Sequence, residues 1–563
     1  MKDFLRDEGG GMRDEGRNER VSVEAAQGAG DTLAPSRHLL DSESHSSLIP
    51  PPSSLCLWLD WGLVVCLFVL AVAAPHSIAA TQVAWLCGMF LWVIRYFVRP
   101  RPVLHRTPLD YALLGFFILT FLSALVSYDR GESIGKLRSA SLFTIFYLVV
   151  ENVPSRRVLR ALVLTLVASC MVNVVYTFAE RMVGRGVKIA GLSVESPLYA
   201  AGIRDGDTLL AVDGAALRSP EALEQALEQR PGRAPYQTIE QMPVAGAARD
   251  AKARVNFYRV EGRPTFEVER GRLLPGETPL ARLGIGNWSR GRDERAAGFY
   301  GHYVTYAEVL QLVGSLALGL LIAQRRKWDL PKVLLAATVG GITAALLLTV
   351  TRAAWLGLLL SAFTIVLIGA SRRTWLVVAA LALPLALAGL FVLQQKRQVG
   401  FLDKRDGSTA WRLMVYRESL GLLVSEPRHM LVGVGMDSIK THYREWGLFD
   451  KGRQSIGHLH STPLQIAVER GLPALLVWLA LVATYARVLW RLARGDGRVE
   501  DWVERGLVLG ALGGLVGFVA SGMVHYNLGD SEVSMIFYFV MGLALVIERS
   551  TRLESQQTKF QQS

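Results

Sequence analysis

Residues 457–472 read GHLHSTPLQIAVERGL, and the rest of the chain is organised around this stretch. Thr462 is typical of an N-cap, Pro463 suits the first helical position, and Gln465 falls where a capping box places an amide or a carboxylate. The pattern therefore predicts a helix that begins just after His460.

The two ends of this short helix carry the candidate catalytic residues, a histidine and a glutamate. His460 precedes a helix N-terminus, where free backbone N–H groups and the helix dipole favour anions such as phosphates. The same positive end disfavours the imidazolium and keeps the ring neutral, which is the form that a general base needs. Gly471 is typical of a helix end and Pro473 of the next helix start. Glu469 opposes the dipole in the last turn, so we expect it to be paired locally or kept for function.

The composition predicts a polytopic membrane protein. The chain has 563 residues, 51% of them hydrophobic, and a mean hydropathy of +0.28, with long apolar runs. The net charge is +12, but the basic residues gather between apolar runs, as in membrane proteins, so we expect no nucleic-acid partner. All four cysteines lie in apolar runs, which predicts neither disulfides nor a cysteine metal site.

Twelve apolar segments of roughly 20 residues are predicted to span the membrane. They lie near 55–74, 77–98, 109–127, 137–153, 158–182, 298–323, 331–350, 353–370, 374–393, 472–492, 503–524 and 531–548. They form three blocks, at 55–182, 298–393 and 472–548. Basic residues follow the second, fourth, sixth, eighth and tenth spans, so we expect both termini to be cytoplasmic.

The side of the membrane on which each soluble stretch lies follows from this alternation of basic ends. Residues 1–54 are polar and are expected to form a disordered cytoplasmic tail, and 549–563 a second cytoplasmic tail. Residues 183–297 and 394–471 are assigned to the outside face, so His460 is expected there.

The first outside stretch is predicted to be an inserted α+β domain. Strand-like and helix-like pieces alternate over 186–229, and 254–270 has the pattern of two strands around a turn. This part resembles a bacterial PDZ domain through Ser196-Pro197, Ala201-Gly202-Ile203, Gly206-Asp207 and Val212-Asp213-Gly214. The short distance from the fifth span to Gly186, and an insertion at 233–252, depart from that family. Peptide binding by a protein partner and a docking or spacer role therefore both stay open.

Arginines on the outside face are the candidate anion-binding residues. Arg352 stands at a junction between two apolar runs, where snorkelling and a functional anion contact are both open. Arg295 precedes the sixth span, and Arg405 and Arg412 flank Trp411 in the second outside stretch. Guanidinium groups suit bidentate phosphate binding, so together they indicate a phosphate-binding surface.

His458 and His460 raise the alternative of a metal site, which His302, His442 or Glu469 would complete. Two histidines at this spacing outside a strand are weak ligand geometry, and no cysteine supports them. We therefore expect no metal ion and no other cofactor.

These features resemble the O-antigen ligase and polymerase superfamily of bacterial envelope enzymes. The family pattern is a histidine with Asn or Ser, then Leu with a polar residue, then Glu-x-Gly, present here as His460-Ser461, Leu464-Gln465 and Glu469-Arg470-Gly471. The Gly433-Val434-Gly435 turn and a histidine loop between the ninth and tenth of twelve spans are similar too. The resemblance covers about 55–548 without the insert.

The resemblance implies an all-α polytopic membrane glycosyltransferase of about twelve helices in the bacterial inner membrane. It implies that His460 serves the acceptor hydroxyl and that Arg352 and Arg295 hold a lipid diphosphate, with Arg412 and Glu469 as weaker candidates. The implied donor is an undecaprenyl-diphosphate-linked glycan, and the implied acceptor is the lipid A core, in contact with membrane lipids.

Other functions stay open. A polymerase or a protein O-glycosylating relative differs only in its acceptor, and the PDZ-like insert favours a protein acceptor. A lipid-glycan flippase explains the span count but not a capped histidine loop outside. An intramembrane metalloprotease needs a His-Glu-x-x-His helix, and none of the ten histidines is followed by Glu.

Overall fold

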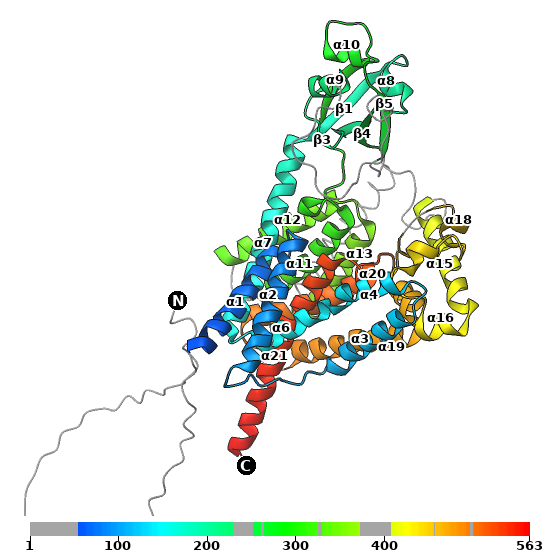
Figure 1. Ribbon diagram of the computed structural model, residues 1–563. Helices are drawn as coiled ribbons and strands as arrows, with labels where there is room; N and C mark the ends of the chain where they lie inside the picture. The colour runs from blue at the N-terminus through cyan, green and yellow to red at the C-terminus, as the bar shows by residue number, and fades with distance from the viewer. Residues whose placement is uncertain are drawn as a thin grey trace, which may run out of the picture.

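The computed structural model describes residues 54–228, 252–259, 264–324, 329–371, 407–454, 457–495 and 499–562. Figure 1 shows a bundle of helices, with a small unit of strands and helices at the top of the view and the C-terminus at the bottom. The predicted tail 1–54, the insertion 233–252 and the ninth span 374–393 lie outside the described residues, apart from Ser54 and Lys252, as does Arg405.

Within the described part of the chain, ten helical segments are long and apolar enough to cross a membrane. Nine of them are α1 (Ser54–Ala73), α2 (Ile78–Phe97), α7 (Arg156–Val183), α11 (Tyr303–Ala323), α12 (Leu330–Leu348), α13 (Arg352–Gly369), α19 (Thr462–Arg494), α20 (Trp502–Gly522) and α21 (Ser531–Gln562). The tenth combines α4 (Arg130–Gly135), α5 (Leu137–Ala140), η2 (Ser141–Phe143) and α6 (Thr144–Asn152). The chain is thus a mostly helical, polytopic membrane protein.

The predicted third span, 109–127, is α3 (Asp110–Leu125), an apolar helix of 16 residues. This is shorter than the roughly 20 residues that a perpendicular crossing needs. With the ninth span outside the described residues, a total of twelve stays a prediction.

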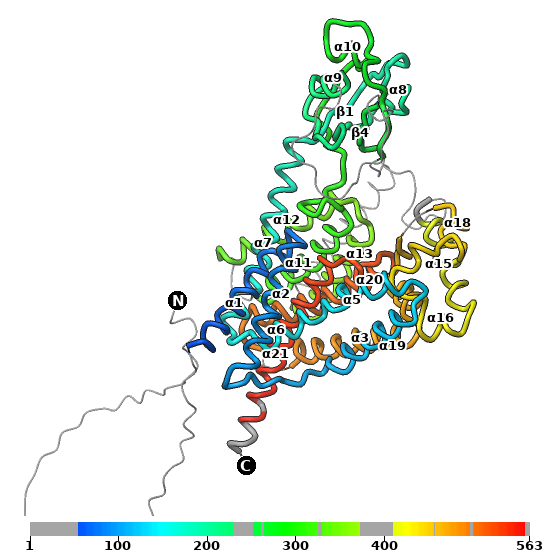
Figure 2. Tube along the Cα trace, viewed as in Figure 1, coloured from blue at the N-terminus to red at the C-terminus, as the bar shows by residue number. Residues whose placement is uncertain are grey.

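The centre of the bundle is formed by α11, α20 and α21, whose side chains are mostly buried. Figure 2 shows α20 running beside α11 and α13, and these helices pack directly against it. Only glycine permits the approach of α11 to α20, because a Cβ on Gly319 would lie 2.4 Å from the Gly506 carbonyl oxygen. Small residues therefore set the spacing between α11 and α20.

The insert is an α+β unit with its own hydrophobic core. Its strands are β1 (Arg185–Leu192), β2 (Thr208–Val212), β3 (Ala215–Ala216), β4 (Lys252–Tyr258), β5 (Thr265–Glu269) and β6 (Ile285–Gly291), and its helices are α8 (Pro197–Ala200), α9 (Pro220–Glu228) and α10 (Pro279–Leu283). The sheet has the order β5-β4-β2-β1-β6, with β3 on β2, and every pair is antiparallel. Leu223 and Leu227 of α9 join the core beside the sheet. The alternating strands and helices predicted over 186–229 and the strand pair predicted over 254–270 are present, and the PDZ assignment stays a prediction.

The second predicted outside stretch is also helical where it is described. It contains α15 (Gly407–Ser425), α16 (Pro427–Val432), α17 (Ser438–His442) and α18 (Leu448–Gly452). The short 3₁₀ helix η3 (Gly298–Tyr300) leads from the insert into α11. A separate apolar cluster joins α15 to the histidine loop through Val415, Leu422, Leu459 and Val468.

Candidate functional site

The helix after the histidine loop begins where the sequence predicts, with one correction. Ser461, not Thr462, is the N-cap, and α19 starts at Thr462. Thr462 does not cap because its N–H and its hydroxyl donate to the His525 carbonyl oxygen at 3.0 and 3.1 Å. Gly471, with φ +84° and ψ 167°, interrupts α19, so the predicted break there is confirmed.

Hydrogen bonds from two side chains hold the backbone of the histidine loop. The Gln465 side-chain oxygen accepts the Leu459 N–H at 2.7 Å, so the predicted capping amide reaches further back than a capping box does. The Tyr416 hydroxyl donates to the His460 carbonyl oxygen at 2.9 Å. His460 itself has φ +50°, a conformation that residues other than glycine rarely adopt. The loop is therefore held in a strained conformation that fixes where the ring lies.

The two histidine rings of the loop pack together and stay uncharged. Their centroids lie 4.1 Å apart, and Trp411 meets His460 edge-on at 5.1 Å. Burial, then the neighbouring His458 and Arg412, lower the pKa of His460 to about 3. Burial and nearby His525 and Lys440 lower the pKa of His458 to about 4. The sequence predicts a neutral ring from the helix dipole, but burial is the main cause.

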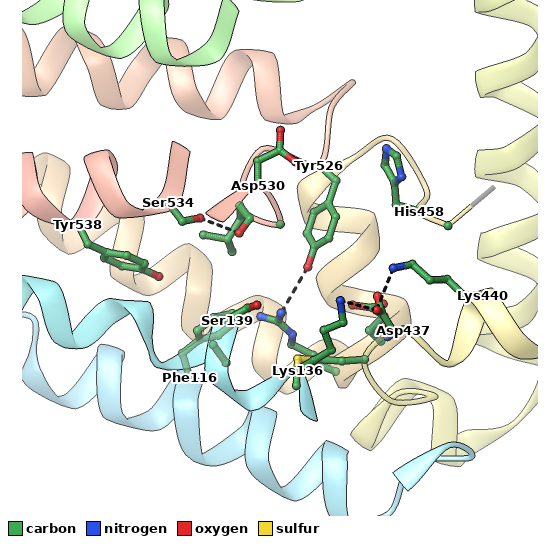
Figure 3. Close-up of a pocket in the computed structure, with 17 residues that line it drawn as sticks. Phe116, Lys136, Ser139, Asp437, Lys440, His458, Tyr526, Asp530, Ser534 and Tyr538 are labelled. Atoms are coloured by element: carbon green, nitrogen blue, oxygen red, sulfur yellow. Dashed lines mark hydrogen bonds and ion pairs between the residues drawn. The ribbon is translucent and has the colours of Figure 1, made fainter. Parts of the chain in front are cut away.

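A cavity of about 210 Å³ opens beside the histidine loop (Figure 3). Its wall is formed by α3, the segment between α4 and α6, α17 with the loop before it, the histidine loop, α19, the segment between α20 and α21, and the start of α21. We call it the Arg470 cavity and define it by Lys136, Asp437, Lys440, His458, Arg470 and Tyr526. Figure 3 shows the Lys136 and Lys440 side chains meeting at Asp437, with His458 and Tyr526 above them.

Glu469 and the Gly433-Val434-Gly435 turn, separate features of the sequence, come together at this cavity. Glu469 lines the cavity, is 2% exposed, and accepts the Asp437 N–H on its carboxylate at 2.9 Å. Val434 and Gly435 donate their N–H groups to the Val468 and Glu469 carbonyl oxygens, each at 2.9 Å. The turn therefore packs on the last turn of the short helix and presents Asp437 to the cavity.

The predicted arginines are divided between two places. Arg412 lies on α15 close enough to His460 for its charge to lower the pKa of that ring. Arg295 lies over the Tyr303 ring at 4.6 Å and lines a second cavity of about 60 Å³ at the base of the insert. Arg352 begins α13, shortly after Leu348 at the end of α12. The Ala296 N–H, next to Arg295, donates to the Leu348 carbonyl oxygen at 3.0 Å, so the two arginines lie on neighbouring segments. Neither Arg295 nor Arg352 is among the residues that line the Arg470 cavity.

Sequence reasoning missed most of the charged wall of the Arg470 cavity. Arg470 lies inside the Glu-Arg-Gly motif, and Asp437 lies two residues after the Gly433-Val434-Gly435 turn; these positions are the available signals. Lys136 and Lys440 lie in segments for which no motif was identified in the sequence. In the part of the chain that the structure describes, no three His, Cys, Asp or Glu side chains form a group that could hold a metal ion.

A known family covers the part of the chain that carries the histidine loop. Residues 337–479 match the O-antigen ligase family. This O-antigen ligase segment runs from within α12 to within α19, about a quarter of the chain, and contains Arg352, Arg412, His460 and Glu469 but not Arg295. No curated protein matches the chain significantly. The O-antigen ligase match supports a membrane glycosyltransferase of the ligase or polymerase type, which implies lipid-linked glycan substrates.

Proposed function

We propose that the chain transfers a glycan from undecaprenyl diphosphate to a sugar hydroxyl of the lipid A core, on the periplasmic face of the bacterial inner membrane. The observation that carries this proposal is the position of His460. It lies in the O-antigen ligase segment, on a loop held by Gln465 and Tyr416, with a ring that is uncharged at neutral pH. A neutral imidazole fixed in this way is suited to accept a proton from an attacking hydroxyl.

The proposed reaction is a single displacement at the anomeric carbon of the glycan. The acceptor oxygen forms a bond to that carbon, the bond to the phosphate oxygen breaks, and the bonding electron pair leaves with undecaprenyl diphosphate. The acceptor proton passes to His460. Because the donor carries its own leaving group, the reaction needs no nucleotide, and one displacement inverts the anomeric centre.

We propose that cations stabilise the charge that develops on the departing diphosphate. Arg412, next to Trp411 on α15, lies close enough to His460 for its charge to lower the pKa of that ring, and it is proposed as one of these cations. Arg352 and Arg295, on neighbouring segments, are proposed to bind the same diphosphate. Glu469 is proposed to act through the Asp437 N–H that it holds, which shapes the site.

A protein O-glycosylating reaction is the second candidate, and the insert favours it. The insert is a folded α+β unit on the chain between α7 and α11, with a core separate from that of the bundle. Such a unit is suited to recruit a polypeptide acceptor. The attachment site of the glycan in the product distinguishes the two reactions.

The test uses the purified full chain in lipid, with an undecaprenyl-diphosphate glycan, lipid A core and a chelator. Wild type should transfer the glycan, and His460→Ala should be slower by about 10²–10⁴-fold, the usual contribution of a general base. His442→Ala is the matched control, because His442 also belongs to the predicted outside stretch but pairs with Glu445.

Three results would contradict parts of the proposal. Transfer by His460→Ala at the wild-type rate would remove His460 from the chemistry. Transfer by wild type to a protein hydroxyl or to a second lipid-linked glycan, but not to lipid A core, would show that the acceptor is not the lipid A core. Loss of transfer by chelation would show that a metal takes part.

A further inference from the structure

The Arg470 cavity holds three cationic side chains from three parts of the chain. Lys136 lies between α4 and α5, Lys440 on α17, and Arg470 in the last turn before the break in α19. The volume of about 210 Å³ is far more than the roughly 10–15 Å³ that one water molecule needs. The cavity therefore has room for a substituent of a substrate.

Two ammonium groups share one carboxylate on the wall of the cavity. The nitrogen atoms of Lys136 and Lys440 lie 2.8 and 2.9 Å from the same Asp437 oxygen, Oδ2. Burial alone would raise the pKa of Asp437, but the two ammonium groups hold it below its usual value. Each ammonium has three N–H donors, and the contact with Asp437 uses one of them. The cluster of Lys136, Lys440 and Asp437 thus has one more positive than negative charge, and its ammonium groups keep donors that Asp437 does not use.

Arg470 is buried against the cavity without a full set of acceptors. It is 7% exposed, and its Nε has no hydrogen-bond partner among the described residues. Its Nη2 donates to the Tyr526 hydroxyl at 3.4 Å, and its guanidinium lies over the Phe116 ring at 5.1 Å. A buried donor without an acceptor is costly, so a guanidinium in this state favours a ligand that accepts hydrogen bonds.

The acidic side chains of the cavity are already engaged. Asp437 faces two ammonium groups, and Glu469 accepts the Asp437 N–H at 2.9 Å and interacts through its charge with the neighbouring Arg470. Asp530 accepts the Thr305 hydroxyl at 2.9 Å, and burial raises its pKa. The donors of Lys136, Lys440 and Arg470 are therefore the groups left to meet a ligand.

We propose that the Arg470 cavity is an anion subsite that binds a phosphoryl group of a substrate, beside the histidine pair and apart from Arg352 and Arg295. His458 lines the cavity and packs against His460, so a bound anion lies next to the proposed base. That the anion belongs to a substrate rests on the function proposed above. Its source is either the diphosphate of the donor or a phosphoryl group on the acceptor.

The first experiment measures binding of inorganic diphosphate to the purified full chain by calorimetry, without any glycan. Arg470→Met and Lys136→Met should each weaken binding by about tenfold, as expected for the loss of one charge-assisted hydrogen bond. Arg453→Met is the matched control, because Arg453 is exposed, pairs with Asp450 and does not line the cavity. Lys136 is partly exposed, so its variant tests the site even if Arg470→Met does not fold.

Unchanged diphosphate binding in folded Lys136→Met and Lys440→Met would overturn the subsite. Diphosphate binding that depends on these residues, in a wild type that transfers no glycan, would support the subsite and count against the proposed function alone. The two failures are thus distinguishable.

The second experiment separates the two sources by steady-state transfer kinetics of Lys136→Met. A rise in KM for the lipid-diphosphate donor alone assigns the subsite to the donor diphosphate. A rise in KM for the acceptor alone, lost when the acceptor is dephosphorylated, assigns it to the acceptor. Unchanged KM for both substrates would overturn the assignment of the anion to a substrate.

Discussion

At the scale of single residues, the low pKa of His460 has a consequence for catalysis. A base with a pKa of about 3 is uncharged at neutral pH but binds a proton weakly. Burial and the neighbouring Arg412 and His458 produce this value in the free protein. An anion bound beside the ring favours the imidazolium, so donor binding should raise the pKa toward the working pH.

The pH dependence of transfer tests the low pKa of the histidine rings. The profile of kcat/KM reports the free enzyme, so its acid limb should lie near the histidine pKa values of about 3 to 4, not near 6.5. Protonation removes the base, so the rate falls as the pH falls through that limb. The limb of kcat, which reports the substrate complex, should lie at higher pH.

The stability of the folded chain also falls as the pH falls, so a loss of activity at low pH needs a control for unfolding. Because the folded pKa values lie below 6.5, the unfolded chain binds more protons, and stability falls as the pH drops from about 6.5 toward 3. Recovery of activity after return to pH 7 separates protonation from unfolding. An acid limb of kcat/KM near 6.5 would show that the rings are not held as the structure has them.

At the scale of elements, the break in α19 joins the short helix to the turn that shapes the site. Gly471 has φ +84° and ψ 167°, a combination essentially confined to glycine. A Cβ at this position would lie 2.4 Å from the Leu431 carbonyl oxygen at the end of α16. The break therefore lets Glu469 and the turn around Gly433 pack closely.

Gly471→Ala should lower the stability of the chain. The backbone conformation alone costs about 1–3 kcal/mol for a residue other than glycine, and the contact with Leu431 adds to it. Gly421→Ala in α15 is the control, since a Cβ there meets nothing within 4 Å and alanine is favoured over glycine in helices by about 1 kcal/mol. Thermal unfolding in detergent measures both variants. An unchanged melting temperature for Gly471→Ala would contradict the geometry of the break.

At the scale of the whole molecule, the insert and the helix bundle have separate hydrophobic cores. The insert begins and ends at one place, because Arg185 of β1 pairs with Gly291 of β6. An exposed ion pair, Lys188 with Asp293, crosses the base of the insert. The bundle therefore depends little on the insert for its stability.

Replacement of residues 186–290 by two glycines should leave a folded bundle. The lost exposed ion pair is worth about 0.2–1 kcal/mol, so the melting temperature of the bundle should shift by no more than about 2–4 °C. Transfer to lipid A core should persist, whereas transfer to a protein acceptor should fail if the insert recruits it. Unfolding of the shortened chain would show that the insert supports the bundle.

The local features of the histidine loop were predictable from the sequence. The start of the helix after His460 and its break at Gly471 depend on residues within one or two turns, through capping, proline geometry and the positive φ of glycine. The polytopic class depends on long apolar runs, which also lie within single segments. Both kinds of signal are local, so the sequence alone determined them.

Only the tertiary structure decided the charged wall of the site. Lys136 and Asp437 are about 300 residues apart in the chain, yet they share an ion pair because the segment after α4 packs beside the loop that Glu469 holds. The neutral state of His460 was predicted for the wrong main reason, since its burial depends on the packing of α15 and α19 around the loop. Composition and capping signals carry no information on which distant side chains meet. The sequence therefore determined the class of the protein and the position of the histidine, and the packing of distant helices determined the charges around it.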